Sequence, residues 1–469
     1  MSPEAMLDRV TAALTRLIDA AEPWEGLFPS MLDLEGRAML REQPTAIHGQ
    51  RDGDRAFLGS NLMHDHVVLR LMYDLDAAGL ADGCAVAADR YLERFATHCT
   101  DTVSGLFPWG EHSFWQLVDD HVGSGHRPDE PEHAIHDHLR QAPVWLWERL
   151  WRINPLCVER FAEGLDNHWT QGEPREYIRH AFIGRRARHP RGARSCDFPR
   201  HGGFYILDWA FAWRHTGRDR FRAQIDVMLD YWWERRFDDG TLLVESRSSD
   251  DATSFTGIAA PSQSQSLAAS LLDTAAQIGD NDAALAATMR ERAQVYLDGF
   301  LAAPHRPEEQ LYVSTFDLAT REPHRPMAAW GSVYGSSAAC GPALLCVAAY
   351  RHTGDRGLLS WSASVGAWYL AEPFPSEIAV PASDAGLALE LFAALHEETG
   401  QRRWLDEGLE RAAELADTYL DRPLPRGAAG IGWYESQMGP GYLLHGLARM
   451  GLLAMGAESC PVAADFSSR

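Results

Sequence analysis

The sequence predicts an all-α fold, an (α/α) toroid or barrel of helical hairpins with short β segments in its loops. Apolar residues recur at the spacing of an α-helix through residues 207–237, 340–374 and 386–420. Each stretch is interrupted by a similar motif, which reads RHTGRDRF, RHTGDRGL and EETGQRRW in turn. A glycine after the last turn of a helix is a common helix end, so each motif predicts a helix, a tight turn and a second helix.

The connections between these hairpins favour a closed ring over an open solenoid. They are long, unequal and rich in aromatic residues, whereas solenoid repeats are usually regular. Strand patterns are few and short, as in TLLVES and QLYVST. No proline- or serine-rich linker divides the chain, so we expect a single domain over residues 1–469, with loops at one end of the ring building a cleft.

The composition excludes several classes of protein. With 45% hydrophobic residues and 16 tryptophans the chain can bury a large core, and its net charge of −23 argues against a nucleic-acid partner. The chain has no lysine, so lysine Schiff-base chemistry is excluded. No stretch has the apolar length of a membrane span or a signal peptide, and the seven cysteines form no CxxC motif. We therefore expect a cytoplasmic protein with no membrane partner; the sequence leaves its oligomeric state open.

Histidine and carboxylate side chains concentrate in three stretches of the sequence. These are GLFPWGEHSFW (105–115), EHAIHDHLRQAPVWLWERLWRINP (132–155) and DFPRHGGFY (197–205). Imidazole and carboxylate groups are ligands of divalent transition metals such as Mn, Co, Ni or Zn, so one ligand from each stretch would make a metal site. The alternative is that these histidines are exposed or hydrogen-bonded within the fold, because the chain has 20 histidines and no compact HExxH motif.

An arginine-rich run lies between the second and third stretches of this acidic chain. Its members are Arg175, Arg179, Arg185, Arg186, Arg188, Arg191, Arg194 and Arg200. Such a run predicts a surface for a carboxylated or phosphorylated ligand. The alternative is a solvated loop in which some arginines form salt bridges with their neighbours. The last member, Arg200, precedes His201 on what we expect to be a short rigid turn between a proline and two glycines.

The three stretches resemble, in order and wording, the motifs of bacterial pectate lyases of the polysaccharide lyase family 2 type. The resemblance implies an (α/α) toroid with a divalent transition metal bound by His112, Asp137 and His201. His136 is the alternative to Asp137 if the register shifts by one residue. The resemblance also implies Arg200 as the catalytic base. The family's HELK-like motif reads HDHLR here, and the arginine-rich run is a second departure from the family's pattern.

The implied reaction is β-elimination in a pectate-like, uronate-containing glycan, so the implied partner is an acidic oligosaccharide. A divalent metal on the substrate carboxylate would stabilise the enolate that forms when the adjacent proton is removed. Arginine acts as a base only where it is desolvated, because its ordinary pKa is far above neutrality. His201 and Tyr205 are the alternative bases.

Contacts with the substrate are expected from aromatic and arginine side chains near these motifs. They are Trp109, Arg194, Tyr205 and Tyr434, with burial in the core as the alternative for the aromatic residues. Two further functions stay open. One is a glycoside hydrolase of the same fold acting on unsaturated uronides, which needs two carboxylates across a cleft. The other is a non-catalytic toroid that binds an acidic sugar through the arginine-rich run.

Overall fold

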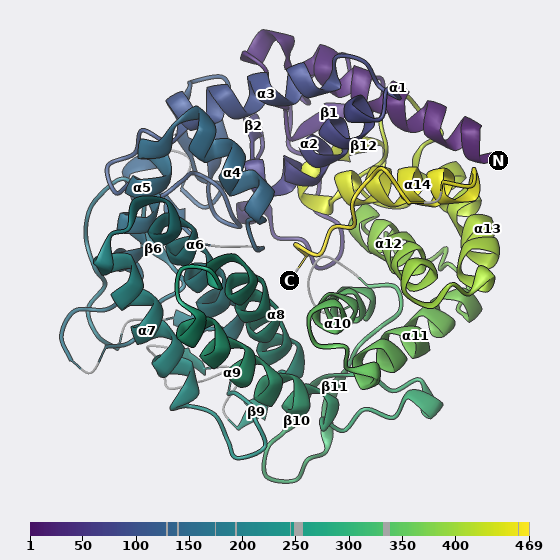
Figure 1. Cartoon of the computed structure of the whole chain (residues 1–469). Coiled ribbons are helices and arrows are strands. Elements are labelled where there is room, and N and C mark those ends of the chain that lie inside the picture. Colours follow the sequence, from purple (N-terminus) through teal and green to yellow (C-terminus); the bar gives the residue numbers. More distant parts are fainter. Residues whose placement is uncertain are drawn as a thin grey trace.

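The computed structural model shows the all-α ring of helical hairpins that the sequence predicts (Figure 1). It describes residues 1–127, 130–137, 140–173, 175–192, 195–243, 245–247, 257–331, 338–457 and 459–468. The α-helices are α1 Pro3–Ala21, α2 Leu62–Ala77, α3 Cys84–Arg94, α4 Val144–Ile153, α5 Pro155–Gly164, α6 Pro199–Thr216, α7 Asp219–Trp233, α8 Pro261–Ile278, α9 Ala283–Leu301, α10 Cys340–Thr353, α11 Arg356–Ala371, α12 Ala382–Thr399, α13 Arg402–Tyr419 and α14 Pro440–Ala454.

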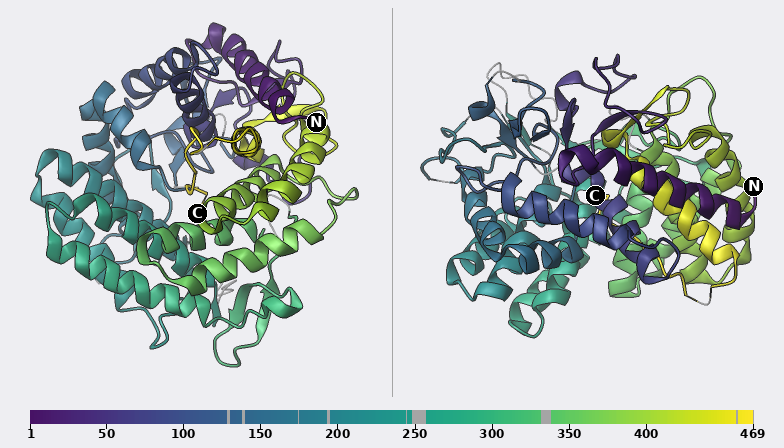
Figure 2. Two further views of the ribbon diagram at one scale, coloured as in Figure 1. Left: turned by 45° about the vertical axis from the view of Figure 1, so that its right-hand side comes forward. Right: turned by 90° about the horizontal axis from the view of Figure 1, so that it is seen from above.

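The inner wall of the ring is a series of helices, each packed against the next. α6 packs on α8, α8 on α10, α10 on α12, α12 on α14 and α14 on α2. The first helix, α1, packs on the last, α14, so the two ends of the chain close the ring (Figures 1 and 2). Inner helices are covered on all sides: α12 buries every residue from 384 to 395, whereas the outer helix α13 buries a single face.

The repeated glycine motifs end three of the inner helices. Gly217, Gly354 and Gly400 follow α6, α10 and α12 with φ values of 67°, 71° and 66°. The N–H of each glycine donates to the carbonyl four residues before it, which satisfies one of the free carbonyls at the helix end. A side chain is strained at positive φ, so glycine is required where the chain turns to the outer helix. The predicted hairpin boundaries are therefore confirmed.

The strands are short and lie in the connections between helices. They are β1 Met31–Asp33, β2 Gly59–Ser60, β3 Phe114–Gln116, β4 His121–Gly123, β5 Ile135–His136, β6 Ala181–Phe182, β7 Ser195–Asp197, β8 Glu245–Arg247, β9 Ile258–Ala259, β10 Val313–Asp317, β11 Pro323–Pro326 and β12 Trp433–Glu435. They pair as β1–β12, β2–β3–β4, β5–β6, β7–β8 and β9–β10–β11. The β1–β12 pair joins loops from the two ends of the chain.

The longer connections gather on one side of the ring, as the view from above shows (Figure 2). They include the loops that precede α2, α6 and α14, and this side holds the candidate site. None of the helices in the described ranges combines the length and the apolar character needed to cross a lipid bilayer.

Candidate active site

The pairing of β5 with β6 brings Asp137 and His180 together. These strands are antiparallel, with Ile135 opposite Phe182 and His136 opposite Ala181. One residue further along this register, Asp137 lies opposite His180. Because side chains alternate between the two faces of a strand, both point away from the face that carries His136. Two residues far apart in the sequence thus become neighbours through a short backbone pairing.

His136 occupies a buried chain of hydrogen bonds on the opposite face. The indole N–H of Trp109 donates to Nε2 of His136 over 3.0 Å, so the proton of this imidazole is on Nδ1. That Nδ1 donates to Nε2 of His168, whose own Nδ1 donates to the carbonyl of Ile178. Both ring nitrogens of His136 are engaged in this chain, which fixes β5 and the segment before β6. The sequence offers Asp137 and His136 as alternative metal ligands. Asp137 is the one that lies beside His112 and His180.

A tight turn places Glu111 and His112 against Asp137. Gly110 has φ of 100°, and a Cβ added there would lie 1.9 Å from the carbonyl oxygen of Asp137, so only glycine fits. The N–H of Glu111 donates to Oδ1 of Asp137 over 3.0 Å, and the Asn61 amide holds the turn by donating to the Gly110 carbonyl. The other oxygen of Asp137, Oδ2, is buried and has no hydrogen-bond partner among the described residues.

The side chains of His112, Asp137 and His180 form a cluster of the kind that binds metals, here called the HDH cluster. One ligand atom from each lies within 4.8 Å of the others, and the two histidine Nε2 atoms are 3.1 Å apart. Burial would lower the pKa of His112, but the charge of Asp137 and the hydrogen bond to Asp54 raise it to about 9. Burial and the charge of Arg179 hold the pKa of His180 well below its usual value. Without a metal, protonated His112 therefore donates to neutral His180.

Asp54 orients His112 from the other side of its ring. Its Oδ1 accepts from Nδ1 of His112 over 3.0 Å and from Nε2 of His126 over 2.8 Å. This hydrogen bond leaves Nε2 of His112 directed at His180, as outer carboxylates do for metal-binding histidines. Asp54, His112 and His126 also form a second group with metal-ligand spacing, although His126 is exposed.

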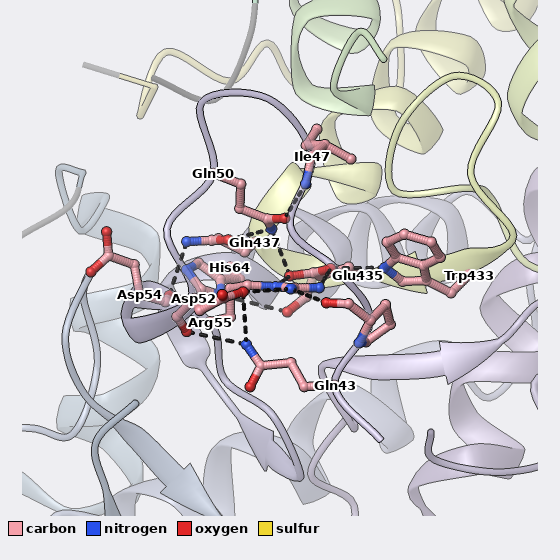
Figure 3. Close-up of polar contacts among 12 residues, drawn as sticks. Gln43, Ile47, Gln50, Asp52, Asp54, Arg55, His64, Trp433, Glu435 and Gln437 are labelled. Atoms are coloured by element: carbon pink, nitrogen blue, oxygen red, sulfur yellow. Dashed lines mark hydrogen bonds and ion pairs between the residues drawn. The ribbon is translucent and has the colours of Figure 1, made fainter. Parts of the chain in front are cut away.

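A buried network from the C-terminal part of the chain holds Asp54 in place (Figure 3). The Gln437 amide donates to the backbone carbonyl of Asp54 over 2.9 Å. The next residue, Arg55, is bound through two nitrogens to Glu435, at 2.7 and 2.8 Å. Gln50 donates to the same carboxylate. The motif GWYESQMGPG near the C-terminus therefore supports the site by fixing the loop that carries Asp54.

Two partly buried arginines lie beside the HDH cluster. Nη1 of Arg179 is 3.3 Å from Oε2 of Glu111. Burial, followed by the charge of Asp137, raises the pKa of Glu111. For Arg200, burial and the charge of Arg179 lower the pKa to about 10. A carboxyl group that can hold a proton thus lies near a guanidinium whose proton is less firmly held than usual.

The structure places the other predicted residues in several different settings. Arg200 and His201 lie in the first turn of α6 and not on a separate turn, because Pro199 opens that helix. His201 is buried, with its ring near Phe198 and Phe204, and within the described residues it belongs to neither metal-type group. His180 takes the third position of the cluster that the sequence assigns to His201.

The aromatic residues predicted to contact substrate lie in the core. Trp109 is fully buried, with its ring packed between Phe107 and Trp147 among others. Tyr205 and Tyr434 are also buried, and burial raises the pKa of both hydroxyls well above the usual value. A sugar cannot reach these rings in this structure, so the core alternative holds for them. Arg194 lies outside the described residues.

Some members of the arginine-rich run are paired with carboxylates, in line with the alternative for it. Arg175 and Arg191 contact Glu173 and Glu176, and Arg185 lies over the ring of Phe182. Apart from Arg200, Arg179 is the member of the run that the structure brings to Glu111. Reasoning from the sequence missed His180 and Asp54. His180 stands within the run, in YIRHAF, but no local spacing links it to Asp137.

Comparisons with known proteins concern the fold. No protein-family model and no curated protein matches the chain. An unsaturated glucuronyl hydrolase from Bacillus sp. GL1 is 14% identical and has a TM-score of 0.47, with 95% of this chain and 96% of that chain covered. A family 76 mannosidase from Bacteroides thetaiotaomicron VPI-5482 is 14% identical with a TM-score of 0.45, covering 96% and 99%. A D-mannose isomerase is 8% identical with a TM-score of 0.44, covering 65% and 84%.

By name, these three proteins are two hydrolases and an isomerase, and none of them is a pectate lyase. At TM-scores below 0.5, the likeness carries no argument about residues or reaction. The toroid fold rests on the order and packing of the helices themselves. The function must be argued from the site.

Proposed function

We propose that the chain is an enzyme that cleaves uronate-containing oligosaccharides by metal-assisted β-elimination. The observation that carries this proposal is the HDH cluster beside Arg179 and Arg200. Metal-type ligands next to guanidinium groups suit a substrate whose reacting carbon is adjacent to a carboxylate. The pectate-lyase resemblance of the motifs points to the same chemistry.

The donor set of the HDH cluster fits a divalent transition metal. The Nε2 atoms of His112 and His180 are 3.1 Å apart. Two nitrogen ligands of one tetrahedral site are separated by about 3.3 Å when each metal–nitrogen bond is about 2.0–2.1 Å. Asp137 adds Oδ2, which is buried and has no partner in the part of the chain that is described. Two imidazoles and a carboxylate suit Mn, Co, Ni or Zn, and a bound metal would supply a Lewis acid for the substrate carboxylate.

The chain's own residues would position the substrate and move protons. Arg200 is the proposed base: with a pKa of about 10, about one guanidinium in a thousand is unprotonated at pH 7. Glu111, whose pKa is raised by burial and by the charge of Asp137, is the carboxyl that can give a proton to the leaving oxygen. Arg179, 3.3 Å from Glu111, adds a positive charge that favours a bound carboxylate.

A second candidate function is glycoside hydrolysis, favoured by the pair formed by Glu111 and Asp137. Burial and Asp137 raise the pKa of Glu111, and Asp137 accepts a hydrogen bond from the Glu111 backbone. Two neighbouring carboxyl groups can serve as acid and base in a glycosidase. This reaction requires no metal, so the histidines of the HDH cluster would have a structural role.

One experiment separates the candidates. Purified protein is analysed for bound metal and assayed, with and without chelator, on polyuronides and on 4,5-unsaturated uronide oligosaccharides. The readout is the ultraviolet absorbance of the 4,5-double bond. Elimination creates that absorbance and is expected to stop when chelator removes the metal. Hydrolysis of unsaturated uronides would instead consume the absorbance and continue in chelator. Chelator-insensitive hydrolysis by metal-free protein would refute the proposed elimination, and metal-free protein without turnover would favour the non-catalytic binding toroid.

A further inference from the structure

Arg140 lies near the HDH cluster, toward the inner helices α12 and α14. Its guanidinium carbon is 4.7 Å from the centre of the Tyr442 ring, in the first turn of α14. The positive charge of Arg140 lowers the pKa of Asp384, in the first turn of α12, and the pKa of Arg200, in the first turn of α6. Arg140 follows Asp137 by three positions, so their Cα atoms are at most about 11 Å apart. It therefore lies within reach of a ligand that occupies the cluster.

The side chain of Arg140 is hydrogen-bonded to the Tyr442 hydroxyl, but one of its donors has no acceptor among the described residues. Its Nη1 is buried and has no hydrogen-bond partner among the described residues. The nearby carboxylate of Asp384 already has other partners. Its Oδ2 accepts from the N–H of Gly331 over 3.0 Å, and its Oδ1 is 3.5 Å from the Ser383 hydroxyl.

Two fully buried arginines of this chain have carboxylate partners. Arg55 is held by Glu435 at 2.7 Å, and Arg449 by Glu390 at 2.5 Å. A guanidinium N–H without an acceptor in a buried position is costly, and a carboxylate that accepts from it removes that cost. Arg140 is partly buried, and its buried Nη1 is a donor to which a ligand carboxylate could bind.

We infer that Arg140 binds the carboxylate of a second acidic sugar, next to the sugar that reacts at the HDH cluster. This inference rests on the proposed function and names the ligand more closely: an oligosaccharide with at least two consecutive uronates. The first turns of α6, α12 and α14 lie around Arg140, and the N-terminal ends of helices attract negative charge. These helix ends would therefore favour a second carboxylate beside Arg140.

The test compares an Arg140→Gln variant with an Arg149→Gln control. Arg149 also lies over a tyrosine ring, 3.9 Å from the centre of Tyr73, but it is partly exposed and pairs with Asp89. Binding is measured by calorimetry on the full chain in chelator, so that turnover does not consume the ligand. The probes are trisaccharides of galacturonate and of glucuronate, each with its carboxyl-reduced neutral counterpart. Melting temperatures are recorded for all three proteins.

Arg140→Gln is expected to weaken binding of an acidic trisaccharide about 10- to 100-fold, the range for loss of a charge-assisted hydrogen bond. Binding of the neutral counterpart and the behaviour of Arg149→Gln should not change. Equal affinity of wild type and Arg140→Gln for the acidic probe would overturn the inference, and so would equal weakening of both probes with a lowered melting temperature. If the wild type binds or converts uronides while Arg140→Gln is unaffected, only this inference fails. If the wild type binds no uronide, the substrate class of the proposed function fails as well.

Discussion

Replacing His180 by alanine tests which histidine completes the HDH cluster. Its Nε2 is 3.1 Å from that of His112, so it supplies one of the three protein ligands. A structural zinc site with four ligands binds with about 10–16 kcal/mol, so one ligand accounts for about 3 kcal/mol. We therefore expect His180→Ala to weaken metal binding roughly 150-fold. The measurement is metal content after dialysis, with the affinity obtained by competition against a chelator.

The matched control is His201→Ala, because the sequence assigns the same role to His201. We expect this variant to keep its metal, since within the described residues His201 belongs to neither metal-type group. His126→Ala, which removes the exposed histidine hydrogen-bonded to Asp54, should weaken binding much less than His180→Ala. Melting temperatures report whether each variant folds. Loss of metal in folded His201→Ala together with full retention in His180→Ala would refute the assignment.

Three further predictions concern the base and the support of the site. If Arg200 is the base, the elimination rate should rise about tenfold per pH unit from pH 7 toward pH 10. The reason is that the unprotonated fraction of Arg200 grows as the pH approaches its pKa of about 10. A rate maximum near pH 6 would contradict this role. Gly110→Ala should destabilise the fold by at least about 2 kcal/mol and abolish activity, because the Cβ of the alanine would collide with the carbonyl of Asp137. Unchanged unfolding in denaturant would show that the turn can relax. Glu435→Gln should lower the free energy of unfolding by about 3–5 kcal/mol, because it removes the buried charge partner of Arg55 and leaves only the exposed Asp52. A loss below about 1 kcal/mol would argue against the role of Glu435 in holding Arg55.

The sequence identifies part of the candidate site, because titratable residues of two motifs lie close together in the fold. The structure brings His112 and Asp137 together in one cluster, with Arg200 beside it, and their binding of a metal stays a prediction. The assignment of His201 follows from its place next to Arg200, but adjacent residues of a helix point in different directions. Helix α6 therefore separates two side chains that a rigid turn would have kept together.

Aromatic residues near a motif indicate the position of the site less well than titratable residues do. Trp109 lies two positions from Glu111 in the sequence, yet it packs into the core and donates to His136. Large aromatic rings gain most by burial, and nothing in a single sequence separates a ring that contacts a sugar from one that supports the motif. The same holds for Tyr434, whose neighbour Glu435 holds Arg55 from a distant part of the chain.

The sequence by itself determines the helical hairpins and their ends. Apolar spacing and glycines such as Gly217 and Gly400 act within a few residues, so their effect can be read from a short window of the chain. Only the tertiary structure decides that His180 faces Asp137, because this depends on the register between β5 and β6. That Nη1 of Arg140 meets no acceptor among the described residues likewise depends on how distant segments pack. Local periodicity is encoded residue by residue, whereas the convergence of distant side chains depends on how the whole chain packs.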